Sequence, residues 1–306
     1  MDRDVWKRIA ASVKRVCRGF KSPRRKLKFS NRQILLMYLW SVNHDRCLSW
    51  ACDRGHYGDL FRPRKLPSIS QFTRRVAEET FQELLLAVHL DLARAGFNSP
   101  VNYLDGKPLA VSPVSKDPDA RRGHVSGGFA KGYKLHAVVS ENRRIVVWSV
   151  MPLNVAEQSV AVEMTRHLPA ACAVVLSLAD SNYDSAPLHK AQAQKDRLLL
   201  TPLKAQGRVK NGKHHPVTLR QMGAQRREMI EVWKNNGDLA RFVLKQRNNI
   251  EGVFSVLSLA LHVSHLPGYV RRLPRVRRWI GAKIILYNAR LDVQQMPQVP
   301  EEVTKS

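Results

Sequence analysis

The sequence predicts an α/β protein in which a basic, helical N-terminal region precedes a mixed sheet flanked by helices. Two observations support this fold class. Apolar residues recur at helical spacing up to about residue 98, and short runs rich in Val, Ile and Leu begin at Val101, with helical patterns between the later runs. With 306 residues, 44% of them hydrophobic, the chain is long enough for about two structural units.

The first expected unit covers residues 1–98 and is mainly helical. Apolar residues follow the helical period over residues 32–42 and again over residues 72–95. Ser30 lies just before the first of these patterns and can cap a helix there. We therefore expect at least two helices that pack through their apolar faces.

A third helix start is expected after Pro67, which ends the preceding segment. Ser68 or Ser70 can cap a helix that carries Arg74 and Arg75 in its first turns. A basic edge near the start of a helix is typical of the recognition helix in a helix-turn-helix unit. The alternative is an ordinary helical bundle whose basic face is solvated.

Five strands and two helices are expected in the next part of the chain. The runs of Val, Ile and Leu favour strands, and the patterns between the later runs favour helices. The expected strands are residues 101–104, 134–140, 145–151, 173–179 and 197–202, and the expected helices are residues 155–167 and 185–194. This order predicts an α/β layer with a mixed sheet.

A basic insertion is expected at about residues 203–227, because this segment has many cations and no acidic residue. Asn211-Gly212 within it is a strong signal for a β-hairpin turn. Further on, residues 249–262 have the apolar spacing of a helix packed on a core, and a last helix is expected near residues 276–289. The polar residues 293–306 are expected to be a disordered tail.

The charge of the chain indicates a polyanionic partner. There are 51 Lys and Arg against 25 Asp and Glu, a formal net charge of +26. Dispersed cations of this kind favour binding to nucleic acid, whose phosphates release counterions when a protein neutralises them. An anionic membrane surface is the rival partner, but the sequence has no apolar run of 18 residues or more, so we expect no membrane association.

The compartment is also indicated by the sequence. The N-terminus lacks the apolar segment of a secretory signal, and the four cysteines are too few and scattered for a disulfide framework. We expect a cytoplasmic protein, associated with the nucleoid, whose thiols are reduced.

Three carboxylates are the candidate catalytic and metal-binding residues. Asp105 follows the first expected strand, Asp180 follows the fourth, and Glu251 lies on the helix over residues 249–262. Aspartates at the ends of neighbouring strands converge, and a carboxylate from a packed helix can reach the same place. Each residue alone has an ordinary interpretation, since Asp is common after strands and Glu is usually a solvated charge on a helix.

Clustered carboxylates repel one another unless a cation holds them, and hard oxygen ligands suit Mg²⁺ or Mn²⁺. Two such ions about 3.5–4 Å apart activate an attacking water or 3′-hydroxyl and stabilise the leaving oxygen of a phosphodiester. The sequence therefore predicts a two-ion site for phosphodiester chemistry.

Four ordered segments around these acids resemble the signature blocks of bacterial insertion-sequence transposases with a DDE domain. The segments are residues 103–109, 131–136, 179–185 and 247–254. The resemblance covers roughly residues 100–290 and implies a ribonuclease-H-like catalytic domain, here residues 99–292. It also implies that the first Asp lies on the first strand, the second Asp after the fourth strand and the Glu on a later helix.

Many members of this group carry Tyr-x2-Arg-x3-Glu-x6-Lys around the catalytic Glu. The present chain keeps Arg247 and Glu251 but has Leu244 in place of the Tyr and Ser258 in place of the Lys. The planar fork of Arg247 suits a phosphate or a carboxylate, and the alternative is a surface ion pair with Glu251.

The expected DNA contacts come from three regions. In relatives, insertions like the one here are β-rich and contact DNA, which favours Arg208, Lys210 and Lys213 as contacts. The others are Arg74 and Arg75 in the N-terminal region, Lys131 and Lys134 on the second expected strand, and Arg247. A basic edge strand that avoids aggregation would look similar to the segment with Lys131 and Lys134.

A possible zinc cluster lies between residues 44 and 56. His44, Cys47, Cys52 and His56 supply four residue types that bind zinc. Their spacing fits no zinc pattern well, so we expect incidental cysteines beside a helix instead.

The combined prediction is a DNA transposase that binds double-stranded DNA at the inverted repeats of its mobile element and at the target. It would cut at the element ends and join the 3′-hydroxyl to target DNA. Two ends are cut together, so a homodimer or a larger synaptic complex is expected. The alternatives are a domesticated or inactive copy that binds DNA without cutting it, and a plain metal-dependent nuclease.

Overall fold

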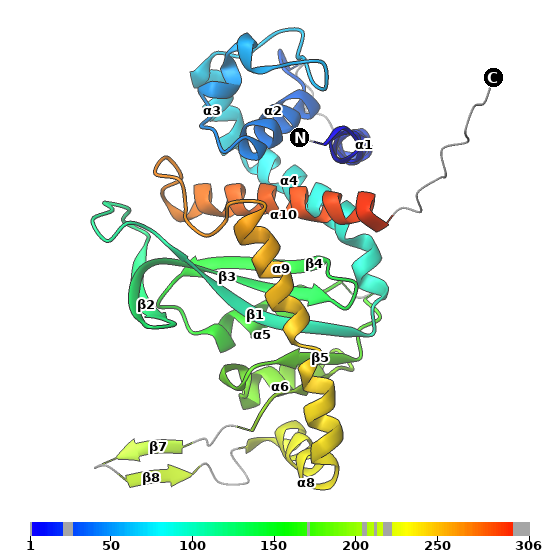
Figure 1. The fold of residues 1–306 in the computed structure, drawn as a ribbon, viewed down its shortest axis with the longest axis vertical. Coiled ribbons are helices and arrows are strands. Elements are labelled where there is room, and N and C mark those ends of the chain that lie inside the picture. Colours follow the sequence, from blue (N-terminus) through cyan, green and yellow to red (C-terminus); the bar gives the residue numbers. More distant parts are fainter. Residues whose placement is uncertain are drawn as a thin grey trace, which may run out of the picture. The chain divides into compact units, whose positions relative to one another are not determined.

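The computed structural model describes residues 2–20, 27–169, 172–203, 207–210, 213–216 and 222–295. The chain divides into two compact units (Figure 1). The first contains Met1–Leu92 together with Gly281–Ser306, and the second contains Ala93–Ile280. The sequence suggested one boundary near residue 98, whereas the chain also returns to the first unit at Gly281.

The first unit is helical. Its helices are α1 (Arg3–Gly19), α2 (Asn31–Asn43), α3 (Ile69–Ala77) and α4 (Glu79–Ala93), with 3₁₀ turns η1 (Trp50–Cys52) and η2 (Arg54–His56) between α2 and α3. Ser30 caps α2 by accepting from the Gln33 N–H at 3.2 Å, as the sequence predicted. Ser68 caps α3 in a capping box with Gln71. The helical pattern over residues 72–95 is divided at Glu78, whose backbone is extended.

Two groups of contacts hold the first unit together. Aromatic rings pack in its core, where Trp6 and Trp40 meet edge to face with centroids 5.1 Å apart. The C-terminal part of α10 (Leu273–Gln295) contributes Lys283, whose buried ammonium lies 2.5 Å from Asp45. Because a buried ammonium needs a partner, this pair ties the returning segment to its own unit.

The second unit contains the expected mixed sheet. The strand order is β2-β3-β1-β5-β6, and β4 also pairs with β3. The strands are β1 (Val101–Ala110), β2 (Arg121–Val125), β3 (Gly128–Ser140), β4 (Ile145–Pro152), β5 (Leu176–Ala179) and β6 (Leu198–Leu200). The pairs of β3 with β1, β2 and β4 are antiparallel, while β5 is parallel to both β1 and β6.

Helices lie on both faces of this sheet. They are α5 (Glu157–Arg166), α6 (Ala186–Ala193), α8 (Ala224–Lys245) and α9 (Asn248–Leu259), with the turns η3 (Arg94–Asn98) and η4 (Ser181–Tyr183). Figure 1 shows α9 crossing one face over β1 and α5 lying behind the sheet. The face of α5 packs Val160 and Met164 against Leu104 and Val138, and α9 buries Ile250 and its apolar neighbours as predicted.

Several element bounds expected from the sequence differ in the structure. The first strand does not end before Asp105 but continues to Ala110, because Gly106 to Ala110 pair with β3. Pro108 is tolerated there because β5 pairs only with β1 residues up to Leu104, so no described strand pairs with Pro108 on that side. The fourth strand starts at Leu176 instead of residue 173. The tail was expected from residue 293, whereas α10 extends to Gln295 and the rest of the tail lies outside the described residues.

The insertion is β-rich only in part. Strands β7 (Gly207–Lys210) and β8 (Lys213–Pro216) pair as the expected hairpin, although the turn residues Asn211 and Gly212 lie outside the described residues. The end of the insertion instead belongs to α8, a helix of 22 residues that the sequence did not predict. Across the described helices, none is long and apolar enough to cross a membrane.

Candidate active site

Parallel pairing of β1 with β5 brings two aspartates to adjacent places. The last pair in this ladder is Leu104 with Ala179, and the next residue on each strand is Asp105 and Asp180. Neighbouring parallel strands lie about 4.8 Å apart, so residues at matching positions are side by side. The predicted convergence of the two aspartates follows from this register, although only β5 ends there.

Arg247 links the third acid to the first. Its Nη1 lies 3.4 Å from Asp105 Oδ2, and its Nη2 lies 3.3 Å from Glu251 Oε1. The Arg247 side chain is 22% exposed and Asp105 is 18% exposed, whereas Glu251 is 60% exposed. One guanidinium therefore bridges a half-buried carboxylate on β1 and an exposed one on α9. The ion pair with Glu251 was one of the two interpretations weighed from the sequence.

Asp180 is oriented by the turn that follows it. Its Oδ1 accepts from the Asn182 N–H at 2.7 Å and its Oδ2 accepts from Asn182 Nδ2 at 3.4 Å. This is the capping arrangement of η4, in which Asp180 is the N-cap residue. The sequence Asp-Ser-Asn thus fixes the carboxylate locally.

Burial dominates the electrostatics of Asp105. It raises the pKa of the carboxyl from 3.8 to about 6, and the nearby acids Asp180 and Glu157 add to the rise. The Gly106 N–H, which donates to Asp105 Oδ1 at 2.7 Å, and the Arg247 guanidinium both act in the opposite direction. The site therefore holds more negative charge than its surroundings stabilise.

The donor set suits a divalent cation. Carboxylate oxygens are the ligands that Mg²⁺ and Mn²⁺ prefer, and an added cation would favour the ionised form of Asp105, whose pKa is raised mainly by burial and further by the nearby acids. However, no three His, Cys, Asp or Glu side chains in the described part of the chain are already gathered in a metal-binding arrangement. Arg247 supplies the positive charge between Asp105 and Glu251 instead.

Comparison with known proteins decides the family. Residues 97–289, well over half of the chain, match the family described as "Transposase DDE domain". The chain belongs to the DDE transposase family.

This assignment agrees with the resemblance found in the sequence and with the mixed sheet of the second unit. A solved structure, described as "Cryo-EM structure of piggyBac transposase synaptic complex with hairpin DNA", is similar to this transposase with a TM-score of 0.44 and 9% identity. The match covers 95% of the present chain and 72% of that chain. No curated protein sequence matches it.

The residues of the transposase that were expected to contact DNA differ in their exposure and in their partners. Arg74 is exposed on α3, while Arg75 is half-buried, with Nη1 3.0 Å from Glu78 and a hydrogen bond to Asn31. Lys131 donates to the Ser115 main-chain oxygen at 2.6 Å. Arg208, Lys210 and Lys213 lie on the β7–β8 hairpin, but their side chains are outside what the structure describes.

Lys134 is placed differently from a surface DNA contact. Its side chain is only 11% exposed, and its ammonium pairs with Glu157 in the first turn of α5. Sequence reasoning missed Glu157, because an acid in the first turn of a helix is common on electrostatic grounds alone.

A second missed cluster lies behind η4. Arg226 of α8 forms two bonds of 2.7 Å with the carboxylate of Asp184, and both side chains are almost fully buried. The sequence placed Arg226 among the cations of the basic insertion. In the structure it is a core residue that fixes the start of α8.

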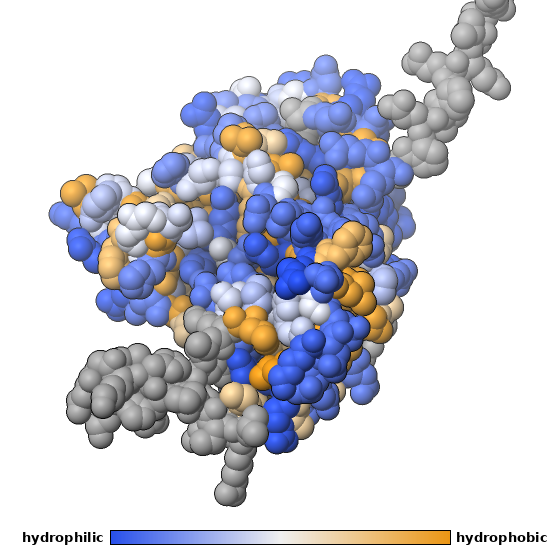
Figure 2. All heavy atoms as spheres, turned by 60° about the horizontal axis from the view of Figure 1, so that its bottom comes forward, coloured by the Kyte–Doolittle hydropathy of each residue, from blue (hydrophilic) through white to orange (hydrophobic). Residues whose placement is uncertain are grey.

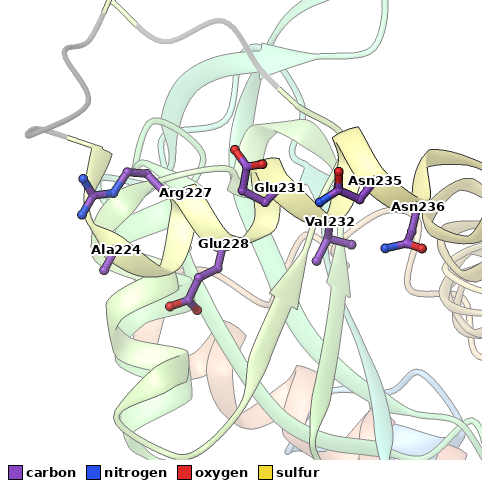
Figure 3. Close-up of a pocket in the computed structure, with 7 residues that line it drawn as sticks. All are labelled: Ala224, Arg227, Glu228, Glu231, Val232, Asn235 and Asn236. Atoms are coloured by element: carbon purple, nitrogen blue, oxygen red, sulfur yellow. The ribbon is translucent and has the colours of Figure 1, made fainter.

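Two other hollows in the described part of the chain differ from this site in their chemistry. Along α8, Figure 3 shows the carboxylates of Glu228 and Glu231 leaving the helix in opposite directions, so they do not converge on a ligand. A hollow of about 240 Å³ between α6, β6 and α8 is lined mainly by apolar residues such as Leu200, Met229 and Leu239. Apolar patches among hydrophilic side chains are visible in Figure 2.

The residues weighed as zinc ligands make local contacts. His56 Nδ1 lies 2.8 Å from the Trp50 main-chain oxygen, and Cys47 Sγ lies 3.0 Å from Ser49 Oγ. Cys52 Sγ lies 3.6 Å from the Leu48 main-chain oxygen. All four cysteines are free thiols.

Proposed function

We propose that this transposase cuts DNA at the ends of its own mobile element and joins the freed 3′-hydroxyl to target DNA. The register of β1 and β5, which sets Asp105 beside Asp180, is the observation that carries the proposal. Glu251 would complete the site from α9, to which Arg247 already links Asp105. The three carboxylates would hold about two Mg²⁺ or Mn²⁺ ions.

When bound, such ions lower the pKa of an attacking water or 3′-hydroxyl and stabilise charge on the leaving oxygen. The protein's own part is to hold the carboxylates at fixed places on a rigid sheet. The pairing of β1 with β3 fixes the backbone at Asp105, and the capping hydrogen bond at the start of η4 fixes Asp180. Rigid placement matters because displacement of a reacting group by about 1 Å costs up to about 100-fold in rate.

Arg247 has a second task in this proposal. Its guanidinium suits a phosphate as well as a carboxylate, and it already lies at the mouth of the site beside the exposed Glu251. We infer that it grips a phosphate next to the scissile bond.

The remaining charge serves DNA binding in this account. The net charge of +26 supports broad contact with phosphates. We propose Arg74 and Arg75 in the N-terminal unit, Lys131 on β3 and the hairpin residues Arg208, Lys210 and Lys213 as contacts with the DNA backbone. Because both element ends must be cut together, the working form would be a homodimer or a larger synaptic complex.

The test is strand cleavage and joining on duplex DNA taken from the flanks of the coding region, in Mg²⁺ or Mn²⁺. The wild type should cut and join, while Asp105→Asn, Asp180→Asn and Glu251→Gln should bind the same DNA and fail to cut. Binding without cleavage by the wild type in either metal would overturn the proposal in favour of a DNA-binding relic. Cutting without joining would indicate a nuclease.

A further inference from the structure

The first turn of α5 contacts β3, the strand paired with β1, and the turn that follows Asp180. Glu157 in this turn pairs with Lys134 on β3, and Gln158 donates from Nε2 to the Asn182 main-chain oxygen at 2.7 Å. We propose that Glu157 and Gln158 are positioning residues that hold Asp105 and Asp180 in place for metal binding. This inference rests on the proposed function above.

Glu157 supports Asp105 indirectly, through Lys134 and Gly106. Added at Gly106, a Cβ would come within 2.9 Å of Lys134 Cδ, so the stem of Lys134 lies directly against the backbone that follows Asp105. The Lys134 and Glu157 side chains are 11% and 21% exposed, which keeps their ion pair largely away from water. Loss of the Glu157 charge would leave a buried ammonium seeking solvent, and its stem would no longer support Gly106.

Gln158 supports Asp180 indirectly, through Asn182. The Asn182 main-chain oxygen accepts from Gln158, while its N–H and side-chain amide donate to the two oxygens of Asp180. The residue that orients the Asp180 carboxylate is therefore itself tied to α5. Because Asn182 bonds directly to both Gln158 and Asp180, a substitution at Gln158 should alter the position of the Asp180 carboxylate.

The buried His136 is neutral, so Lys134 is the cation that pairs with Glu157 in the described structure. His136 follows Lys134 by two residues on β3 and is 2% exposed. Burial lowers the pKa of His136 to about 4, although Glu157 acts to raise it. The ring is thus neutral at neutral pH, which leaves Lys134 as the positive partner of Glu157 in the described structure.

The anchor of α5 is separate from these contacts. Val160, Ala161 and Met164 are buried and pack on the sheet, so the helix keeps its core when residues in its first turn are neutralised. This separation allows positioning to be tested without unfolding the domain. Glu163 provides a matched control, since it lies on the same helix, is 54% exposed and pairs only with its near neighbours Arg166 and His167 among the described contacts.

The experiment compares Glu157→Gln, Gln158→Ala and Glu163→Gln with the wild type by amide hydrogen exchange, without metal or DNA. Glu157→Gln should speed exchange in residues 103–110, and Gln158→Ala should do so in residues 180–184. In cleavage assays, Glu157→Gln should raise the Mn²⁺ concentration for half-maximal rate by about 10-fold and leave the Kd for DNA unchanged. Glu163→Gln should match the wild type in every respect.

Two results would overturn the inference. One is exchange in Glu157→Gln and Gln158→Ala that equals the control. The other is faster exchange spread evenly over the second unit, which would mark a general loss of stability instead of positioning. If the wild type cuts no DNA, the proposed function fails on its own, while the exchange experiment still decides whether α5 positions the two aspartates.

Discussion

Asp105 is a candidate metal ligand whose ionised carboxyl lowers the stability of the folded chain. Its carboxyl lies mostly out of water on β1, beside Asp180, and its pKa is raised to about 6. A raised pKa means that the folded chain binds more protons than the unfolded chain between about pH 4 and pH 6. The contribution of Asp105 to stability therefore falls as pH rises through this window.

We predict that Asp105→Asn raises the free energy of unfolding by roughly 1 to 3 kcal/mol above pH 6, since each pKa unit corresponds to about 1.36 kcal/mol. The difference should shrink as pH falls below 6 and vanish well below pH 4, where the wild-type carboxyl is protonated in both states. Urea denaturation at several pH values without divalent metal measures this. A wild type that is the more stable protein at pH 7.5 would contradict it.

The site residues differ in how far the sequence reveals them. The adjacent placement of Asp105 and Asp180 was predictable because each follows an apolar run, and the helical placement of Glu251 because its segment is strongly periodic. Glu157 was not, since its partner Lys134 is more than 20 positions away and looked like a surface cation. The contact between these distant residues depends on how α5 packs against β3, which no local sequence pattern predicts.

At the scale of elements, α8 is held by one buried ion pair. Arg226 and Asp184 join the start of α8 to the segment between η4 and α6, and His189 Nε2 lies 3.4 Å from the same carboxylate. Removal of one partner of a buried pair costs more than the pair contributes, because it leaves a desolvated charge.

We predict that Arg226→Met lowers the free energy of unfolding by roughly 3 to 5 kcal/mol. Its exposed neighbour Arg227 gives the control, because Arg227→Met should change stability by less than about 0.5 kcal/mol. Denaturation of the full chain in urea measures both. Equal effects of the two substitutions would show that the buried pair is not what secures α8.

The elements that the sequence missed share a physical cause. Residues 235–237 of α8 read Asn-Asn-Gly, which disfavours a helix, and Asn236 indeed has non-helical angles. Tertiary contacts maintain the helix there, including a 2.8 Å bond from Trp233 Nε1 to the Thr201 main-chain oxygen. The strand β1 likewise continues through Gly106 and Pro108, which locally resemble a turn, because β3 pairs with them.

At the scale of the whole molecule, a family assignment, a mixed sheet and a large positive charge support the same account. The sheet of the second unit holds the acids, and 51 Lys and Arg over the chain suit a polyanionic partner. The sequence predicted the two-part organisation, but not that residues from Gly281 onward join the first unit. That return depends on buried contacts such as Lys283 with Asp45, which are distant in sequence.

The central claim is that Asp105, Asp180 and Glu251 together bind the metal ions used to cut DNA. Titration of the protein–DNA complex with Mn²⁺, followed by electron paramagnetic resonance, tests it most directly. The account predicts that the wild type and Glu163→Gln take up about two Mn²⁺ ions per chain beyond those bound by the DNA alone. It also predicts that Asp105→Asn and Asp180→Asn lose this uptake. Equal uptake by the wild type and both aspartate variants would contradict the account.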